Sequence, residues 1–284
     1  MKDYFGYQGK NCVITGAASG MGKATAEMLV ELGANVYGLD WNEVDVPGIQ
    51  KYIHVNLAEK ESIDDAFAQI PDTIDSFFGV AGISGLKHNF NTTVIIDFIA
   101  NKYITEEYLE KRISEGGAIV YCTSTGGLGW QIPEIVEESL ILIKQQGWEN
   151  TCAALESMGQ QATKGGRGYA FAKRALNYYV AYIVEKFGVK KVRVNAVLPG
   201  STDTGLTDDF IGMVGTKENL VKMAGFAQRL AASEEMAYPM VFLNSDMATF
   251  ISGELLIADY GLSILEIAGI RQGTPRGPLV KKPE

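Results

Sequence analysis

The chain is poor in the side chains from which metal centres and disulfide frameworks are built. Its 284 residues include only three cysteines and two histidines. The cysteine count is odd, and Cys12, Cys122 and Cys152 lack the close spacing of a zinc site. We therefore expect no metal and three free, mainly buried thiols, which are typical of the reducing cytoplasm.

The sequence also lacks long apolar runs and an excess of positive charge. No run of about 18 apolar residues occurs, and Met1 to Lys10 has no apolar core of signal-peptide length. Acidic residues outnumber basic ones by 34 to 25, giving a net charge of -9, whereas nucleic-acid or anionic membrane surfaces need a concentrated basic patch. We expect a cytoplasmic protein that binds small molecules and neither nucleic acid nor membrane.

Hydrophobic residues, 46% of the chain, occur in short runs that alternate with amphipathic stretches. This pattern is typical of strand–helix units repeated around a parallel sheet. Length alone allows one large α/β domain or two small ones, but seven candidate strands fit one doubly wound sheet. The predicted strands are Cys12 to Thr15, Val36 to Asp40, Tyr52 to Val55, Ser76 to Ala81, Ala118 to Cys122, Val192 to Leu198 and Leu255 to Ala258.

Helical periodicity defines the segments between these strands. The glycine-rich run Lys164 to Gly168 is interpreted as a flexible entry to the helix that begins at Tyr169. We expect one domain over residues 1–270, with a helical insertion over 126–166 and a tail, 271–284, that has no regular structure unless a partner subunit orders it. The predicted helices are Met21 to Leu32, Ser62 to Ile70, Asp97 to Ser114, Ile132 to Gln146, Trp148 to Gln161, Tyr169 to Phe187 and Glu234 to Leu243.

Tyr169 and Lys173 are four residues apart in a predicted helix, so their side chains share one face, about one turn apart. A free phenol, with a pKa of about 10, is almost fully protonated at neutral pH. A neighbouring ammonium favours the phenolate and lowers that pKa, which lets a tyrosine act as a general acid or base. Taken alone, the pair is also consistent with an aromatic side chain packed on the core and a lysine in solvent.

A glycine-rich turn joins the first predicted strand to the first helix, with Gly16, Gly20 and Gly22 in the spacing Gly-x-x-x-Gly-x-Gly. Glycine lets the backbone turn tightly and approach a pyrophosphate, while the free N–H groups and the dipole of the helix N-terminus attract it. In this context the turn predicts a dinucleotide site. The alternative is a glycine-rich turn without a ligand.

Asp40 ends the second predicted strand, 24 residues after Gly16. A carboxylate in this place accepts hydrogen bonds from the adenosine ribose hydroxyls, and its charge repels the 2′-phosphate of NADP. The next two residues, Trp41 and Asn42, offer no cation to bind that phosphate. The sequence therefore favours NAD, whereas the alternative for Asp40 is a solvated strand end.

Together with Ser124, these motifs resemble the short-chain dehydrogenase/reductase family. The resemblance runs from about residue 9 to residue 263 and implies a single Rossmann-like α/β domain with helices on both faces of a mainly parallel, seven-stranded sheet. Within the family, the chain is most similar to the bacterial 3α-hydroxysteroid dehydrogenase/carbonyl reductase group, chiefly because of the helical insertion. The other segments that carry the resemblance are Val80 to Gly82, Leu198 to Thr204, Gly253 and Asp259.

The resemblance implies catalytic roles for three residues. Tyr169 would donate or accept the proton, Ser124 would hydrogen-bond the substrate oxygen, and Lys173 would hold the nicotinamide ribose and lower the tyrosine pKa. Thr123 and Thr125 are the nearest competitors of Ser124, but their alternate strand positions should point their hydroxyls away.

The resemblance also implies a set of NAD-binding residues. Asn56 and Leu57 would lie near the adenine, and Thr202 or Thr204 would contact the carboxamide of the nicotinamide. The full set, beside Tyr169 and Lys173, is Gly16, Ser19, Gly20, Met21, Gly22, Asp40, Trp41, Asn56, Leu57, Ala81, Gly82, Pro199, Gly200, Thr202 and Thr204.

Two positions depart from the family pattern. The usual Asn-Asn-Ala-Gly is replaced by Gly79 to Gly82, which leaves the steadying of the central sheet to other groups. The fourth catalytic residue, usually an asparagine whose backbone holds a water in a proton relay, aligns with Asp97, 27 residues before Ser124. We expect Asp97 to keep the relay through its backbone carbonyl. An acidic residue near a helix N-terminus without a catalytic role is the alternative, and Asn101 is a second candidate.

The 45-residue separation of Ser124 and Tyr169 exceeds the spacing common in the family. Helices here would cover the surface where many relatives pair their long helices, so a homodimer or homotetramer would use a different contact. The alternative is an insertion that has no effect on the assembly. Residues 203–231 should form a lid over the substrate. Met213, Met223 and Phe226 give it apolar faces suited to a large hydrophobic ligand, although ordinary packing would use the same residues.

The leading hypothesis is an NAD(H)-dependent enzyme that interconverts a secondary alcohol and a ketone, with a hydroxysteroid or bile acid as substrate. The steroid specificity rests on the resemblance. The nearest alternative is the same chemistry on a small cyclic ketone, a polyol or a polyphenol-derived ketone. A third is an NAD-sensing protein without turnover, but such a protein would be expected to lose Ser124, Tyr169 or Lys173, and all three are present.

Overall fold

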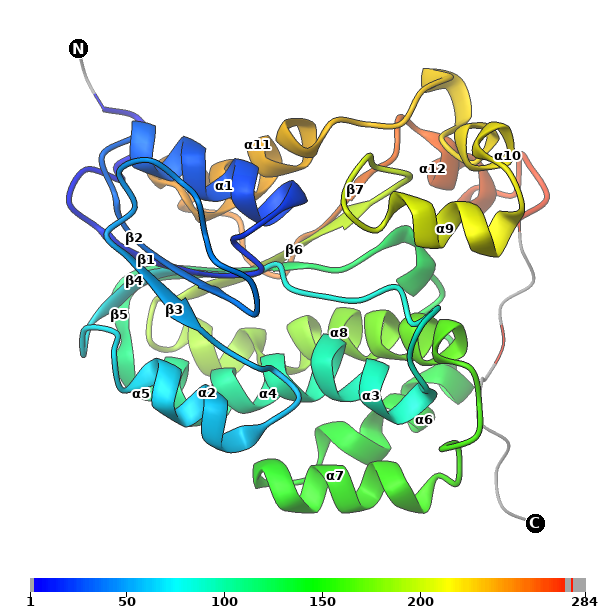
Figure 1. Ribbon diagram of the computed structural model, residues 1–284, viewed down its shortest axis with the longest axis horizontal. Coiled ribbons are helices and arrows are strands. Elements are labelled where there is room, and N and C mark those ends of the chain that lie inside the picture. Colours follow the sequence, from blue (N-terminus) through cyan, green and yellow to red (C-terminus); the bar gives the residue numbers. More distant parts are fainter. Residues whose placement is uncertain (1–2, 274–276, 278–284) are drawn as a thin grey trace.

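A seven-stranded sheet forms the centre of the computed structural model, which describes residues 3–273 and Gly277 (Figure 1). The strand order is β3-β2-β1-β4-β5-β6-β7, and every neighbouring pair is parallel. The predicted doubly wound α/β fold is therefore confirmed. The strands are β1 Asn11–Thr15, β2 Asn35–Asp40, β3 Lys51–His54, β4 Ile74–Gly79, β5 Ile113–Cys122, β6 Arg193–Pro199 and β7 Leu255–Ala258.

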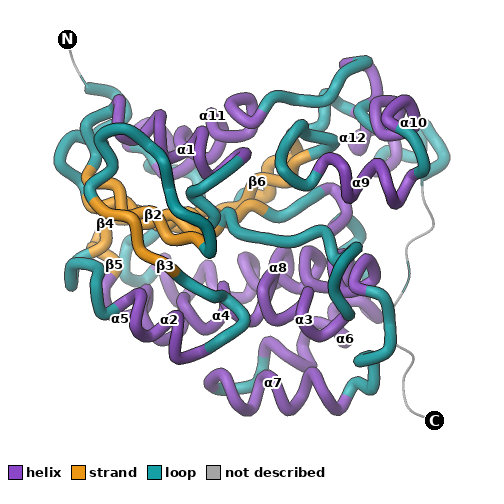
Figure 2. Tube along the Cα trace, in the orientation of Figure 1, coloured by secondary structure: helices purple, strands orange, loops and turns teal. Residues whose placement is uncertain are grey.

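Helices connect the strands and cover both faces of the sheet. Figures 1 and 2 show α1 and α11 on one face and α2, α4 and α8 on the other. The α-helices are α1 Gly20–Glu31, α2 Lys60–Phe67, α3 Phe90–Val94, α4 Ala100–Ile104, α5 Glu110–Arg112, α6 Pro133–Ile143, α7 Gly147–Ser157, α8 Gly165–Gly188, α9 Thr207–Val214, α10 Lys217–Lys222, α11 Ser233–Asn244 and α12 Leu262–Ile267. The π-helical turns η1 Ile95–Ile99 and η2 Thr105–Leu109 and the 3₁₀ turns η3 Thr125–Gly127, η4 Gly225–Ala227 and η5 Asp246–Ala248 complete the connections.

The strands are apolar on both faces because each face has its own core. Val13 and Phe77 belong to one hydrophobic cluster, whereas their neighbours Ile14 and Phe78 belong to the other. Successive strand side chains point to opposite faces, so a strand buried on both sides contains a continuous apolar run. This is why the short apolar runs of the sequence located the strands.

The helix predicted over Asp97 to Ser114 is wrong at its N-terminal end. Helical structure begins at Phe90 and runs through η1, α4, η2 and α5 to Arg112. Asn89 is the N-cap, and its side chain accepts a hydrogen bond from the backbone N–H of Thr92 at 2.9 Å. Asparagine is a preferred N-cap residue, but the polar run that contains it interrupts the apolar periodicity, so the first turns were missed.

The prediction that Lys164 to Gly168 form a flexible entry is also wrong, because α8 begins at Gly165. A Cβ at Gly165 would collide with the carbonyl oxygens of Gly85 and His88. The backbone N–H of Gly165 donates to the His88 carbonyl at 3.0 Å. Glycine is required here for close packing of two backbones, and the helix start is fixed.

The insertion before α8 contains the two predicted helices, α6 and α7, which pack on α8 and on η1. Lys102 of α4 anchors it. This lysine is 1% exposed, and its ammonium donates to Glu106 Oε2 at 2.7 Å and to the Gln145 carbonyl, just after α6, at 2.6 Å. The Trp148 indole of α7 packs edge-on against Tyr103, with ring centroids 5.5 Å apart.

The tail predicted over 271–284 lies largely outside the described residues. Residues 271–273 contain no helix or strand, and the Gly277 carbonyl accepts a hydrogen bond from Arg174 of α8 at 2.9 Å. Within residues 3–273 and Gly277, no helix is long and apolar enough to cross a membrane. Across the same residues, no cluster of histidine, cysteine and carboxylate side chains could hold a metal ion. All three cysteines are free, and Cys152 is only half-buried.

Lys102→Met tests whether the buried ammonium anchors the insertion. The change leaves Glu106 and the Gln145 carbonyl without their shared donor and should lower the free energy of unfolding by about 1–3 kcal/mol, less than for a fully buried pair because Glu106 is partly exposed. Urea denaturation and limited proteolysis between α6 and α7 measure the effect. The matched control is Lys111→Met, which breaks the exposed Lys111–Glu107 pair and should change stability by less than about 0.5 kcal/mol. Equal effects of the two changes would contradict the anchor.

Candidate active site

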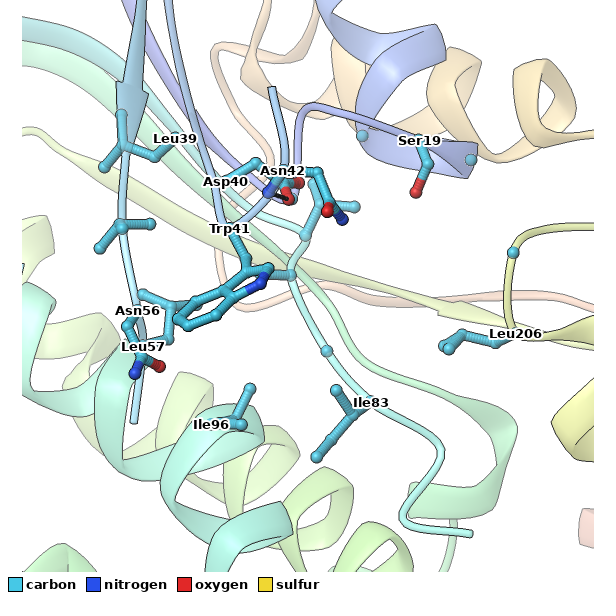
Figure 3. Close-up of a pocket in the computed structure, with 18 of the residues that line it drawn as sticks. Ser19, Leu39, Asp40, Trp41, Asn42, Asn56, Leu57, Ile83, Ile96 and Leu206 are labelled. Carbon is cyan, nitrogen blue, oxygen red and sulfur yellow. Dashed lines mark hydrogen bonds between the residues drawn. The ribbon is translucent and has the colours of Figure 1, made fainter. Parts of the chain in front are cut away.

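A cavity of about 600 Å³ opens at the carboxyl ends of β1, β2 and β4 (Figure 3). The strand order reverses between β1 and β4, and open parallel sheets bind their ligands at such a switch point. Pro199, Gly200 and Thr202 do not line this cavity. The predicted cofactor residues that line it are Gly16, Ser19, Gly20, Met21, Gly22, Asp40, Trp41, Asn56, Leu57, Ala81, Gly82 and Thr204.

The glycine-rich turn packs closely against backbone and lies beside the N-terminus of α1. Gly16 has a φ of +79°, and a Cβ at this residue would lie 2.8 Å from the backbone nitrogen of Ala81. A Cβ at Gly22 would collide with the carbonyl oxygen of Gly16. The first turn of α1 contains no acidic side chain, and its N-cap, Ser19, makes no side-chain cap hydrogen bond. The N-terminus of α1 is therefore available to an anion such as a pyrophosphate.

Asp40 holds the glycine-rich turn from the end of β2. Its Oδ2 accepts from the backbone N–H of Ala18 at 3.0 Å, and its Oδ1 accepts from the backbone N–H of Asn42 at 2.9 Å. A carboxylate has about four acceptor positions, so Asp40 can accept further donors. Figure 3 shows the Trp41 indole along the cavity wall between Asp40 and Asn56, with Ile96 and Ile83 facing it from below.

Ser124, Tyr169 and Lys173 lie together beyond this cavity. Tyr169 and Lys173 project from the same face of α8, and the Lys173 ammonium lies 5.4 Å from the centroid of the phenol ring. Ser124 follows the end of β5. A Cβ at Gly126 would lie 3.3 Å from Ser124 Oγ and 3.4 Å from Tyr169 Cε1, so both side chains border the same small space. The hydroxyl of Thr123 points away, as predicted, and donates to the Val197 carbonyl at 3.3 Å.

The pKa of Tyr169 is raised above that of a free phenol. Burial raises it, whereas the Lys173 ammonium and a hydrogen bond with Ser124 lower it, and the carboxyl of Asp97 raises it again. Lysine thus acts in the predicted direction, but desolvation of the phenol outweighs it. Burial would by itself lower the pKa of Lys173, but Asp97 and Tyr169 more than offset that effect and raise it.

Asp97 is fully buried on η1. Its Oδ1 accepts from the backbone N–H of Ile83 at 2.8 Å, and its Oδ2 lies 3.5 Å from the Lys173 ammonium. Its backbone carbonyl, the group expected to hold a relay water, accepts a hydrogen bond from the Asn101 side chain at 3.2 Å. The side chain is therefore the part of Asp97 that faces the predicted catalytic lysine.

Other groups replace the missing asparagines after β4. The Thr15 hydroxyl accepts from the backbone N–H groups of Val80 and Ala81 at 3.2 and 3.3 Å. Together with the Asp97–Ile83 hydrogen bond, this contact fixes the strand end. At the end of β6, Thr202 is buried with its hydroxyl on the Gly200 carbonyl at 3.1 Å, so Thr204 is the better placed of the two candidate hydroxyl contacts.

The α9 helix of the predicted lid packs against Tyr169. Phe210 packs edge-on against the Tyr169 ring, with centroids 5.8 Å apart. Asp209 ties the lid to the loop after β4, because its Oδ2 accepts from the Ser84 hydroxyl at 2.6 Å and its Oδ1 pairs with Lys87 at 2.8 Å. Phe210 had not been singled out from the sequence, since only its distance from Tyr169 in space makes it informative.

Several other lining residues were missed from the sequence. Five of the eleven belong to the loop after β4 and to the first turns of the helix that begins at Phe90. A helix that was predicted to start at Asp97 placed these turns outside regular structure, although the N-cap Asn89 could have revealed them. The missed residues are Leu39, Asn42, Val55, Ala58, Val80, Ile83, His88, Thr92, Ile96, Gly205 and Leu206.

Known proteins match nearly the whole chain. The family model described as "short chain dehydrogenase" matches residues 10–133, and the related model "Enoyl-(Acyl carrier protein) reductase" matches residues 138–263. Coniferyl-alcohol dehydrogenase of a Pseudomonas species is 27% identical over 259 residues, covering 89% of this chain and 96% of the relative. The 3α-hydroxysteroid dehydrogenase/carbonyl reductase of Comamonas testosteroni is 25% identical over 256 residues, covering 88% and 95%.

Solved structures share the fold. The 3α-hydroxysteroid dehydrogenase of Pseudomonas sp. B-0831, complexed with NADH, superposes with a TM-score of 0.75 at 23% identity, covering 91% of this chain and 99% of the other. Levodione reductase superposes with a TM-score of 0.69 at 20% identity, covering 91% and 99%. The segments that the two family models match include the glycine-rich turn, Ser124, Tyr169 and Lys173. The chain belongs to the short-chain dehydrogenase/reductase family of nicotinamide-dependent oxidoreductases.

Proposed function

We propose that the protein is an NAD(H)-dependent enzyme that interconverts a secondary alcohol and a ketone, with a hydroxysteroid or similar cyclic alcohol as substrate. One observation carries the chemistry: the Tyr169 phenol, the Lys173 ammonium and the Ser124 hydroxyl lie together beside a cavity with the glycine-rich turn in its wall. This arrangement disfavours a sensor without turnover, which would not need all three groups.

The residues of the cavity fit a dinucleotide. The turn from Gly16 to Gly22 lines the cavity, its tight backbone packing leaves no room for a Cβ at Gly16 or Gly22, and the adjacent helix N-terminus has no acidic side chain in its first turn. Asp40 favours free ribose hydroxyls over a 2′-phosphate, and the exposed Trp41 and Asn42 supply no cation. NAD is therefore the proposed cofactor.

The chain's own residues would manage the proton and the substrate oxygen. Bound cofactor would exchange a hydride with the substrate carbon. Tyr169 would give its proton to the oxygen during ketone reduction, or remove it as phenolate during alcohol oxidation. Ser124 would hydrogen-bond that oxygen, and the Lys173 charge would stabilise the phenolate. Since the proton moves as the carbon changes oxidation state, no free alkoxide builds up.

The substrate class is inferred from the lid and from one relative. Phe210 lies on the Tyr169 ring, and the exposed side chains of Met213, Met223 and Phe226 extend the apolar character of residues 203–231. Large flat apolar alcohols suit such a surface. The name of the Comamonas relative supports a steroid. The name of the Pseudomonas relative, coniferyl-alcohol dehydrogenase, supports a smaller aromatic alcohol as the second candidate.

The assembly remains a prediction. The insertion helix α6 packs on α8, and Lys102 joins the end of α6 to α4. A homodimer or homotetramer would therefore have to pair through a face that α6 and α7 do not cover. The cytoplasmic location is likewise a prediction, which rests on the three free cysteines.

A substrate panel tests the proposed reaction. Purified protein with NAD should form NADH with one or more 3-hydroxysteroids or bile acids, monitored by the absorbance of NADH, and Tyr169→Phe should lose about 10²–10⁴-fold in rate while still binding NAD. Turnover of coniferyl alcohol or small cyclic alcohols, with none of any steroid, would select the second candidate. NAD binding without turnover of any member would instead support a sensor.

Cofactor selection is tested by Asp40→Ala combined with Trp41→Arg. The exchange removes the charge that opposes a 2′-phosphate and adds a cation that can pair with it. We expect the ratio of kcat/KM for NAD to that for NADP to fall about 100-fold or more, because each lost or gained charged hydrogen bond changes binding by roughly tenfold or more. Asp40→Ala alone should give an intermediate ratio. An unchanged ratio would mean that Asp40 does not face the ribose.

The lid contact is tested by Phe210→Ala. If Phe210 binds a large apolar substrate, kcat/KM for the preferred steroid should fall about tenfold or more, with a smaller loss for a small cyclic alcohol, because a phenylalanine side chain contributes roughly 1.5–3 kcal/mol of apolar burial. Phe250→Ala is the matched control, since Phe250 is fully exposed outside the site and should change neither value. Equal losses for large and small substrates would exclude a role in specificity.

A further inference from the structure

The surroundings of the Lys173 ammonium contain a second buried charge. Lys173 is 4% exposed and Asp97 is 0% exposed. The ammonium donates to the Cys122 carbonyl at 3.4 Å and lies 3.5 Å from Asp97 Oδ2, so neither contact is short. Gly82 lies beside both charges: a Cβ there would be 3.2 Å from Lys173 Nζ and 3.4 Å from each oxygen of Asp97.

The carboxyl of Asp97 is held from one side only. Oδ1 accepts from the Ile83 backbone N–H at 2.8 Å, whereas Oδ2 is buried and has no hydrogen-bond partner within the described residues. A buried carboxylate oxygen without a donor is costly unless a positive charge faces it. Lys173 is the cation that faces Oδ2.

We propose that the carboxylate of Asp97 is a fixed counter-ion of Lys173, a positioning residue that makes the buried pair nearly neutral and so keeps the proton on Tyr169 up to higher pH. The proposal rests on the proposed function, because it assigns Asp97 an effect on the proton-transfer step. It gives the side chain of Asp97 a role that the backbone relay expected from the sequence does not include.

The direction of the effect follows from charge. An isolated ammonium beside Tyr169 stabilises the phenolate, whereas an ammonium compensated by a carboxylate stabilises it less. Tyr169 then remains a proton donor at neutral pH, which suits ketone reduction, and becomes a base for alcohol oxidation only as the pH rises. Consistent with this direction, Asp97 is among the groups that raise the pKa of Tyr169.

The other titratable groups around the pair come from two elements. Cys122 of β5 is buried, and burial raises the pKa of its thiol to about 11, so it stays neutral near pH 7. Burial raises the pKa of Asp97, whereas the Lys173 ammonium, the Ile83 N–H and, last, His88 in the loop before α3 lower it. A test of Asp97 must therefore separate its contribution from that of His88.

Asp97→Asn is the test. The amide keeps the shape and can still accept from the Ile83 N–H through its oxygen, but it carries no charge. We expect the phenolate of Tyr169 to form about one pH unit lower than in the parent protein. The measurement is the phenolate absorbance as a function of pH, taken with and without Tyr169→Phe so that the difference isolates one tyrosine among 13. It needs neither substrate nor cofactor.

The kinetic counterpart is the pH profile of alcohol oxidation. In Asp97→Asn the rising limb should move in the acid direction by the same amount, so that oxidation at a pH below the limb increases about tenfold per unit of displacement. The maximum rate on the alkaline plateau should change only modestly. If neither the parent nor the variant turns over any alcohol, the proposed function fails, while the absorbance titration still decides the role of Asp97.

Two control variants separate charge beside Lys173 from other effects. Asp64→Asn removes a carboxylate that pairs with Lys60 of α2 at 2.7 Å, outside the site. It should change neither the pH at which Tyr169 ionises nor the pH profile of alcohol oxidation. His88→Gln should likewise leave the Tyr169 titration in place. A Tyr169 titration that does not move in Asp97→Asn, or moves to higher pH, would overturn the counter-ion proposal. An equal displacement in His88→Gln would also overturn it.

Discussion

The burial of one ammonium group, that of Lys173, is the interaction on which the candidate site depends. A charge removed from water is costly unless polar groups replace its hydration. Here those groups come from separate elements: the Cys122 carbonyl at the end of β5, the Asp97 carboxyl on η1, and the Tyr169 ring on α8 itself. Each element must be in place before the charge can be buried. The packing of α8 and the pKa of Tyr169 therefore depend on the same contacts.

The sequence predicted the features that local rules determine. The apolar runs located the strands because both faces of the sheet are covered, and β7 was placed with its observed bounds, Leu255–Ala258. The glycine spacing after β1 located the turn because a Cβ at Gly22 has no space. The four-residue spacing of Tyr169 and Lys173 placed both side chains on one helical face. In each case the constraint lies within a few neighbouring residues.

Features that depend on contacts between distant segments were not predicted. The polar residues before Asp97 concealed the start of the helix at Phe90 because they serve its N-terminus rather than its apolar face. The glycines from Gly165 to Gly168 resemble a flexible linker, but the backbone of Gly85, His88 and Phe90 leaves no room for a Cβ at Gly165 or Gly168. The sign of the net shift in the pKa of Tyr169 depends on burial as well as on the adjacent lysine. Sequence spacing reveals the lysine but not the burial.

The contact between the start of α8 and the loop after β4 also bears on how such a protein can evolve. Gly165 lies against Gly85 and His88 with no side chain between them, and Phe90 donates its N–H to the Thr163 carbonyl at 2.9 Å. The position of the helix is thus set one turn ahead of Tyr169, from the side of the loop. A change of length farther up the insertion would therefore leave this backbone contact, and with it the register of α8 at Tyr169, in place as long as the packing of α6 on α8 is kept.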